Sequence, residues 1–173
     1  LSEIKTELKK IDISDPVFQK SIELDEFGTN VVKYLLKNIE NKSKSKLNSK
    51  RVVNTTTLEH IMPQTIQNTD WDDKTSKSFV TTNDHRKYLD RIGNLTLLHK
   101  ITNSELQNLS FELKRSKYRT ETDIDMTKKL ADATFWNVKE IEKRSENLSG
   151  DVVDIWSTIL DDDVTSQTSD NSV

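Results

Sequence analysis

The sequence contains no cysteine, and this absence excludes several kinds of site at once. Disulfide bonds, thiolate metal sites and a cysteine nucleophile are all ruled out. Only three histidines occur among the 173 residues, so a closed zinc site would need several carboxylate ligands. If the protein uses a metal, a hard divalent cation held by oxygen ligands is therefore the more natural choice.

Long apolar runs are missing as well. No stretch approaches the roughly 20 consecutive apolar residues that a membrane-spanning helix needs. Hydrophobic residues make up 32% of the chain and the mean hydropathy is −0.73, which is polar for a globular protein. The length suits one domain with or without an appendage, and we expect some segments to lie outside the core.

The net charge of −3 hides a strong segregation of charge along the chain. Residues 31–52 carry seven Lys or Arg against one acid, and residues 99–119 carry five against two. Residues 120–173 carry thirteen acids against five bases. The two basic stretches could bind a polyanion such as a nucleic acid, or they could be ordinary solvated helix faces and a loop. Charge alone leaves both interpretations open.

Apolar spacing and capping residues predict a mostly helical chain with two strands. The strands are expected over 52–63 and 94–98. The expected helices cover 2–10, 15–24, 28–40, 84–92 and 110–119, with others starting at Thr102 or Asn103, at Thr127 and at Thr134. Residues 41–51 are predicted to be a flexible basic loop, and residues 161–173 a disordered acidic tail.

Local patterns also predict single roles. Asn83 and Ser110 are expected to cap helices, and Gly93 to end one. The expected core residues include Val17, Ile22, Leu24, Trp71, Trp136, Trp156 and Ile159. His85 is expected on a surface helix without a function.

Three polar residues stand at the ends of the central elements. His60 ends the first expected strand, Asn94 precedes the second, and Asn103 opens the helix that follows. Each has an ordinary explanation when taken alone, because the Glu59-His60 pair could be exposed, Asn94 could form a turn and Asn103 could cap a helix. A strand pair and a helix can, however, bring such ends to one point, and only the joint occurrence suggests a site.

Motifs at these positions resemble one nuclease family. The motifs are "LEHIMPQ" (58–64), "RIGNLTLL" (91–98), "NSELQNLSFELKRSKY" (103–118) and the segment 135–156. Together they resemble the HNH-type branch of the His-Me finger, or ββα-metal, nucleases. More narrowly, they are similar to the HNH-type domain at the C-terminus of GmrSD-like modification-dependent restriction enzymes and of SspE-like phage-defence proteins.

The resemblance implies an α+β fold that is mostly α, with a ββα-metal core embedded in a helical domain. It implies helical connector residues at 1–50, a nuclease domain at 51–160 and the tail at 161–173. The implied activity is nicking or cutting of phage DNA, modified DNA included, in the bacterial cytoplasm. A nucleotide-hydrolysing N-terminal domain would control this activity in a longer protein.

The resemblance also implies roles for individual residues. His60 would be the general base, Glu59 and Asn103 would hold one Mg²⁺ or Mn²⁺, and Asn94 would orient the His60 backbone without touching the metal. A neutral imidazole can accept a proton from water near neutral pH, which suits the role of His60. Residues expected to contact DNA phosphates are Lys114, Arg115 and Lys100, and further candidates near the site are His99 and Asn108. For Lys114, a solvated helix lysine is an equally good interpretation.

Two features depart from the wider HNH pattern. The acidic position is Glu59 rather than the more common Asp, although Glu is normal in the narrower family. The connection from Pro63 to Asp90 is longer than in minimal HNH domains. Two alternatives to a DNA endonuclease stay open: a catalytically inactive DNA-binding or docking module of the same fold, and a nuclease that acts on RNA.

Overall fold

The computed structural model describes residues 15–46 and 56–165. The expected helix at 2–10, the segment 47–55 and residues 166–173 lie outside the described residues. The described elements are α2 (Asp15–Leu24), α3 (Thr29–Lys46), β1 (Thr56–His60), α4 (Thr82–Tyr88), η1 (Ile92–Asn94), β2 (Leu95–His99), α5 (Lys100–Leu106), α6 (Phe111–Thr120), α7 (Asp125–Lys128), η2 (Lys129–Asp132) and α8 (Val138–Thr165).

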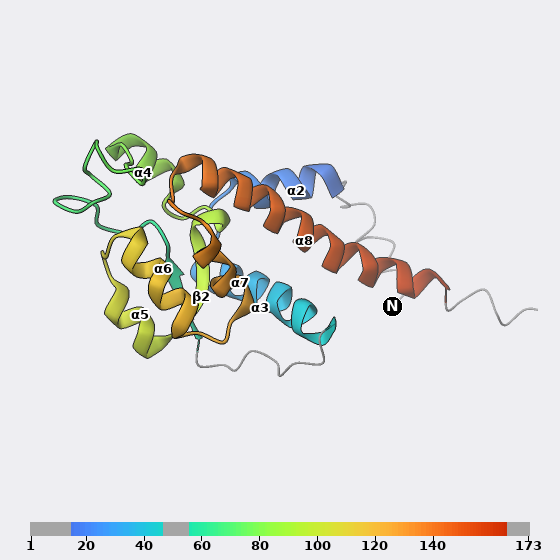
Figure 1. The fold of residues 1–173 in the computed structure, drawn as a ribbon. Coiled ribbons are helices and arrows are strands. Elements are labelled where there is room, and N and C mark those ends of the chain that lie inside the picture. Colours follow the sequence, from blue (N-terminus) through green and yellow to red (C-terminus); the bar gives the residue numbers. More distant parts are fainter. Residues whose placement is uncertain (1–14, 47–55, 166–173) are drawn as a thin grey trace, which may run out of the picture.

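The two strands form an antiparallel pair near the middle of the molecule (Figure 1). Thr56 lies opposite His99 at one end, and His60 lies opposite Leu95 at the other. Helix α5 follows β2 directly, so the order strand, strand, helix is present. The expected fold class, mostly α with a two-stranded core, is therefore confirmed. Strand β1 ends at His60 rather than at residue 63, and residues 52–55 of the expected strand lie outside the described residues.

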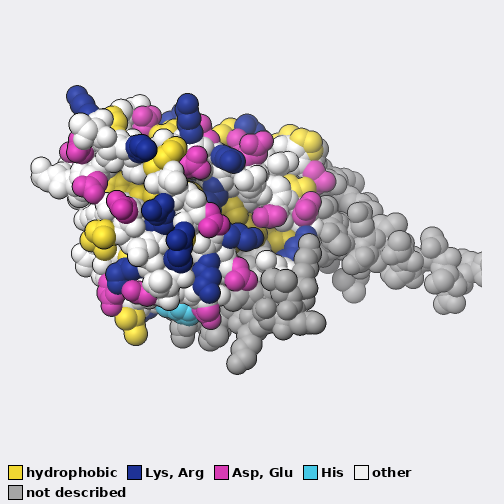
Figure 2. All heavy atoms as spheres, viewed as in Figure 1, with side chains coloured by type: hydrophobic (Ala, Val, Ile, Leu, Met, Phe, Trp, Pro, Cys, Tyr) yellow, Lys and Arg dark blue, Asp and Glu magenta, His cyan; other side chains and the backbone are white. Residues whose placement is uncertain are grey.

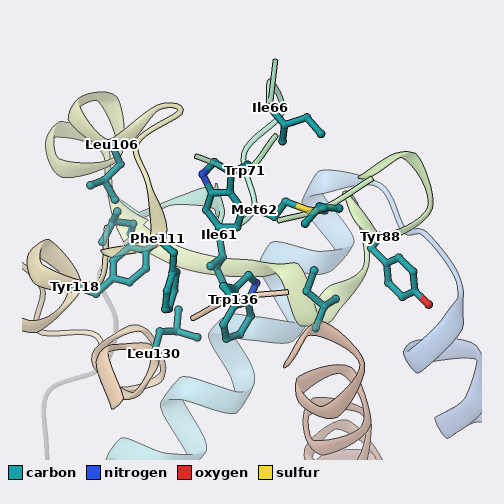
Figure 3. Packing of buried hydrophobic residues seen from close by; sticks show 13 residues of the cluster. Ile61, Met62, Ile66, Trp71, Tyr88, Leu106, Phe111, Tyr118, Leu130 and Trp136 are labelled. Carbon is teal, nitrogen blue, oxygen red and sulfur yellow. The ribbon is translucent and has the colours of Figure 1, made fainter. Parts of the chain in front are cut away.

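Two hydrophobic clusters hold the strand pair. The first, which we call the aromatic cluster, combines Trp71, Phe111, Tyr118 and Trp136 with aliphatic residues from the segment after β1, from β2 and from α5 (Figure 3). Phe111 stacks on Trp136 with 5.6 Å between ring centroids. Trp71 and Trp136 are therefore core residues, as predicted. Trp156 is only partly buried, where it packs beside the second cluster and meets Tyr34 edge-on.

The second cluster, which we call the helical cluster, lies between the N-terminal helices, α8 and the strands. Ile22 of α2 and Leu36 of α3 pack with Leu95, Leu97 and Val152. Figure 1 shows α2 lying along the long helix α8, with α3 below it. The helices before residue 50 thus share a core with the strand pair. Their role as a connector to another domain stays a prediction.

Several predicted boundaries are corrected by the structure. Helix α2 covers 15–24 as expected, but Val17 and Leu24 are 59% and 44% exposed, and Ile22 is the one buried residue of the expected three. Phe18 and Ile22, four residues apart, share the packed face instead. Helix α3 continues to Lys46, into the expected loop, and α8 continues to Thr165, into the expected tail. The side chain of Ile159 lies outside the described residues.

Capping was predicted correctly at α6 and two positions off at α4. Ser110 caps α6 by accepting a hydrogen bond from the Leu113 backbone N–H. At α4 the cap is Thr81, whose hydroxyl accepts from the Asp84 backbone N–H at 3.0 Å, and Asn83 lies within the first turn. Both Thr and Asn are good caps, so sequence alone did not distinguish them.

Neither of the two threonines that were expected to cap a helix does so. Thr127 is buried within α7, where its hydroxyl donates to the Leu97 carbonyl at 2.6 Å and so ties α7 to β2. Helix α8 begins after Asn137 rather than Thr134, since the Asn137 side-chain oxygen accepts from the Lys139 N–H at 3.0 Å. None of the helices in the described ranges combines the length and apolar content needed to span a bilayer.

Gly93 does not end a helix but lies where η1 touches α8. A Cβ at this position would meet the Ile141 carbonyl oxygen at 2.1 Å and the Ser145 hydroxyl at 2.4 Å. Its φ is not positive, so the glycine is required by this close approach rather than by an unusual turn. The Gly93 N–H also donates to the Ser145 hydroxyl at 3.1 Å.

Arg144 reinforces the same contact from α8. Its Nη1 donates to the carbonyls of Gly93 at 2.8 Å and Leu95 at 2.7 Å. Burial lowers the pKa of the Arg144 guanidinium to about 10. The Arg144 guanidinium thus satisfies carbonyl groups at the start of β2 that accept no strand or helix hydrogen bond.

We predict that Gly93→Ala lowers the free energy of unfolding by about 2–3 kcal/mol or more, because the backbone of α8 cannot retreat from the new methyl group without breaking helix bonds. Urea unfolding followed by tryptophan fluorescence measures this. The matched control is Gly150→Ala in α8, where a Cβ would meet nothing closer than 3.9 Å. That substitution should raise stability by about 0.5–1 kcal/mol, since alanine is the better helix former. Equal effects of the two substitutions would contradict the packing argument.

Candidate active site

The site is organised by the side-chain amide of Asn94, which is completely buried. Its Oδ1 accepts from the Met62 N–H at 2.8 Å, and its Nδ2 donates to the Met62 carbonyl at 3.0 Å. Nδ2 also donates to the Leu89 carbonyl at 2.9 Å, and the Trp136 indole donates to Oδ1 at 3.2 Å. One amide therefore joins the segment after β1, the end of α4 and the aromatic cluster.

The backbone of Asn94 extends the same junction. Its carbonyl accepts from the Ile61 N–H at 2.9 Å, which continues the strand pairing one residue beyond His60. Farther along, the Pro63 carbonyl accepts a hydrogen bond from Nε2 of His85 at 2.8 Å. His85 is buried, so our expectation of a surface position is wrong, and the expectation that it has no function stays a prediction. The position of His60 is thus fixed by contacts on the residues that follow it.

Glu59 lies beneath the end of β1 rather than at the surface. Its Oε1 accepts from Nζ of Lys114 at 2.7 Å and from the Tyr118 hydroxyl at 3.0 Å. The same Nζ donates to the His60 carbonyl at 2.8 Å. Lys114 has no exposed surface, and only 5% of the Glu59 side chain is exposed. Helix α6 therefore delivers a buried cation that binds both Glu59 and the backbone of His60.

This placement corrects the expected role of Lys114. Neither a phosphate contact nor a solvated face is available to a side chain buried against a carboxylate. Burial lowers the pKa of the Lys114 ammonium, and the neighbouring Glu59 charge partly opposes that shift. Burial, together with the same carboxylate, raises the pKa of the Tyr118 hydroxyl well above its ordinary value. Tyr118 therefore stays protonated and serves Glu59 as a hydrogen-bond donor.

The His60 ring meets a residue that the sequence analysis did not select. Nε2 of His60 lies 2.8 Å from Oδ1 of Asp90, which stands between α4 and η1. The His60 side chain is 16% exposed and that of Asp90 is 51% exposed. The pair is thirty residues apart in sequence, so no local signal could have found Asp90.

Asn103 approaches β1 from α5. Its Nδ2 donates to the Thr57 hydroxyl and to the Leu58 carbonyl, each at 2.9 Å. Leu58 precedes His60 by two residues, which corresponds to about 7 Å along the strand. The Asn103 amide is thus anchored within the same short stretch as Glu59 and His60. Its Oδ1 has no hydrogen-bond partner among the residues that the structure describes.

The donor set that is present fits a hard divalent cation. Glu59 and Thr57 point to the same face of β1, and Asn103 touches Thr57 on that face. Oε2 of Glu59 and Oδ1 of Asn103 receive no hydrogen bond from the described part of the chain. The described residues contain no cluster of three or more His, Asp or Glu that could hold a metal. Water and substrate would therefore complete the coordination, as is common for Mg²⁺.

Three other expected residues are placed away from this point or engaged elsewhere. His99 lies at the opposite end of the strand pair, four positions from Leu95 or about 13 Å along the strand. Its ring bonds to Asp123 at 2.7 Å. Arg115 is partly buried and donates to the Ala133 carbonyl at 3.2 Å. Asn108 is exposed after the end of α5.

Most cations of the basic stretch at 99–119 bind carboxylates or backbone carbonyls of the protein itself. Arg119 donates to the Ala131 carbonyl at 2.7 Å, and Lys117 pairs with Glu105 and Glu121. Lys100 is exposed and remains available to a phosphate. Figure 2 shows that the visible face mixes basic and acidic side chains rather than carrying one continuous basic surface. The charge count along the sequence therefore overstates the basic surface that this stretch offers.

We predict that Lys114→Met lowers the free energy of unfolding by about 3–5 kcal/mol, because it leaves the Glu59 carboxylate buried without a counter-charge. The double variant Glu59→Gln, Lys114→Met should lose less than the single variant, since it removes the stranded charge. Urea unfolding of all variants measures this coupling. Lys117→Met on the same helix is the control and should change stability by less than about 1 kcal/mol, because its ion pairs are at the surface. A double variant as unstable as the sum of its single changes would contradict the coupling.

Comparison with known proteins bears on this arrangement. The family described as the C-terminal domain of GmrSD restriction endonucleases matches residues 12–150. No curated protein matches the chain closely enough to be counted as a relative. The family match begins before α2 and ends within α8, so it spans the aromatic cluster, the helical cluster up to residue 150 and every residue of the site. By this match the chain belongs to the family of C-terminal domains of GmrSD restriction endonucleases.

Proposed function

We propose that the chain is a metal-dependent DNA endonuclease domain in which His60 is the general base. Membership of a restriction endonuclease family supports a nuclease function. The observation that carries the proposal is the joint anchoring at the end of β1. There, Asn94 fixes the segment after His60, and Glu59 and Asn103 each keep one oxygen that receives no hydrogen bond from the described residues.

The chemistry asked of His60 is the removal of a proton from water. The His60 imidazole takes this proton as the water oxygen attacks the phosphorus of a phosphodiester. The bond between phosphorus and the leaving oxygen breaks, and that oxygen takes a proton from solvent. His60 then returns its own proton to solvent, so one water is consumed and no other reactant is needed. The His60 ring is suited to this, because it is held in place and part of its surface remains open to water.

Glu59 and Asn103 are the residues that would hold Mg²⁺ or Mn²⁺, through oxygens. The cation would supply stabilisation of the negative charge that develops on the phosphate and on the leaving oxygen. Lys114 holds the Glu59 carboxylate in place, because its ammonium binds Oε1 and leaves Oε2 for another ligand. Asn103 is held by its amide hydrogens, so its oxygen is directed away from the strand.

The wider setting of the activity is also a proposal. Family membership favours DNA as the substrate, with phage DNA and its modified forms as targets in bacterial defence. A nucleotide-hydrolysing N-terminal domain would control the nuclease in a longer protein of the cytoplasm. Lys100, which is exposed after β2, is the remaining candidate for a phosphate contact among the expected residues.

We predict that the chain nicks supercoiled plasmid in the presence of Mn²⁺ and that His60→Ala lowers the rate at least about 100-fold, because water loses its proton acceptor. Conversion of supercoiled to open-circular plasmid measures the rate. His85→Ala is not a suitable control, since its ring is buried against Pro63, and Lys77→Ala at an exposed loop position is used instead.

The outcomes of this assay separate the alternatives. Undiminished nicking by the His60 variant would remove His60 from the role of base. Binding of plasmid without nicking by the unchanged chain would favour the inactive docking module. Cleavage of structured RNA in a parallel assay, with plasmid left intact, would favour the RNA-directed nuclease.

We predict that Asn103→Ala raises the Mn²⁺ concentration for half-maximal nicking about 10-fold or more, because an oxygen ligand is lost. A titration of Mn²⁺ against nicking rate measures the change. Thr57→Val is the matched control, since it removes one of the contacts that anchor Asn103 but keeps the amide oxygen. If both variants shift the titration equally, Asn103 acts through the fold and not as a ligand.

A further inference from the structure

The contact between His60 and Asp90 has no role in the activity as proposed so far. Nε2 of His60 and Oδ1 of Asp90 are 2.8 Å apart, which is the length of a good charge-assisted hydrogen bond. A carboxylate can only accept, so the hydrogen in this bond belongs to Nε2. A neutral His60 ring in this pose therefore carries its lone pair on Nδ1.

Asp90 is held in position by the same junction that holds His60. The residue before it, Leu89, gives its carbonyl to the Asn94 amide at 2.9 Å. The residue after it, Arg91, gives its carbonyl to the Asn94 N–H at 2.8 Å. Oδ1 of the same Asn94 amide accepts from the N–H of Met62, which lies two residues beyond His60. A single buried residue thus sets the separation between the backbone of His60 and the backbone of Asp90.

The exposure of the two partners suits a positioning role. About half of the Asp90 side chain is exposed, so placing a carboxylate there carries no large cost of burial. The His60 side chain is mostly covered, with 16% exposed, so its ring has few alternative partners. The carboxylate consequently decides which ring nitrogen bears hydrogen and how the ring is turned.

We propose that Asp90 is a positioning residue that holds His60 as the Nε2–H tautomer and leaves Nδ1 as the atom that accepts the proton from water. The role in catalysis rests on the proposed function, in which His60 is the base. Proton transfer from water then ends on Nδ1, while the hydrogen on Nε2 stays in the bond to Asp90. An imidazolium formed in this way is stabilised by the carboxylate that faces its other nitrogen.

The tautomer can be observed without any activity. The full chain is labelled with ¹⁵N-histidine, and long-range proton–nitrogen correlation spectra are recorded at about pH 9, where ordinary imidazoles are neutral. Loss of one signal set in His60→Ala assigns the ring among the three histidines of the chain. We expect His60 to be the Nε2–H tautomer in the unchanged chain and a mixture of tautomers in Asp90→Ala. Asp90→Glu should restore the single tautomer, at least in part.

Nicking kinetics with saturating Mn²⁺ test the role in catalysis. Asp90→Ala should lower kcat about 10- to 100-fold, a loss typical of removing the carboxylate that orients a functional histidine, with little change in KM for plasmid. Asp90→Glu should recover part of this loss. The matched control is Asp123→Ala, which removes the carboxylate from the other exposed pair, at 2.7 Å from Nε2 of His99. It should alter the His99 signals and leave nicking unchanged.

Each result decides the proposal. An Nδ1–H tautomer of His60 in the unchanged chain, or a tautomer that does not respond to Asp90→Ala, overturns it even if the chain nicks DNA. A shifted tautomer with undiminished kcat overturns the role in catalysis. A chain that nicks neither DNA nor RNA but shows the expected tautomers removes the proposed function while the structural assignment of Asp90 stands.

Discussion

The buried amide of Asn94 is the interaction on which the rest of the site depends. An amide in the interior is stable only when its hydrogen bonds are satisfied, and here four bonds reach three separate parts of the chain. These bonds fix the exit of β1, the end of α4 and the indole of Trp136 relative to one another. His60 and Asp90 contact each other because both stand next to residues that Asn94 holds.

The elements that sequence predicted well are those set by local chemistry. Ser110 caps α6 because a hydroxyl at that position meets an open backbone N–H, and Trp71 and Trp136 are buried because large rings favour the core. The motifs also led to Glu59, His60, Asn94 and Asn103, whose neighbours in space the structure now supplies. The contact between Asp90 and His60 was out of reach, since only the folded chain brings those two residues together.

Buried and paired cations are the residues that the sequence analysis interpreted wrongly, and the reason is physical. Lys114 was counted as part of a basic stretch, yet it is buried against Glu59, and Arg115 and Arg119 bind backbone carbonyls near η2. Arg115 and Arg119 complete hydrogen bonds of carbonyls around η2, and Lys114 pairs with the Glu59 carboxylate and the His60 carbonyl. A count of cations along the chain cannot distinguish such groups from those that face solvent, because their partners come from distant segments.

The contact of Gly93 with α8 has a mechanical consequence. Ile141 and Ser145 press directly on this glycine, and Arg144 grips the carbonyls on either side of Asn94. A shift or tilt of helix α8 at this point would therefore displace the peptide that carries the Asn94 amide. A force applied farther along α8, or to α2 that lies beside it, would reach the His60 imidazole through Asn94 and Met62.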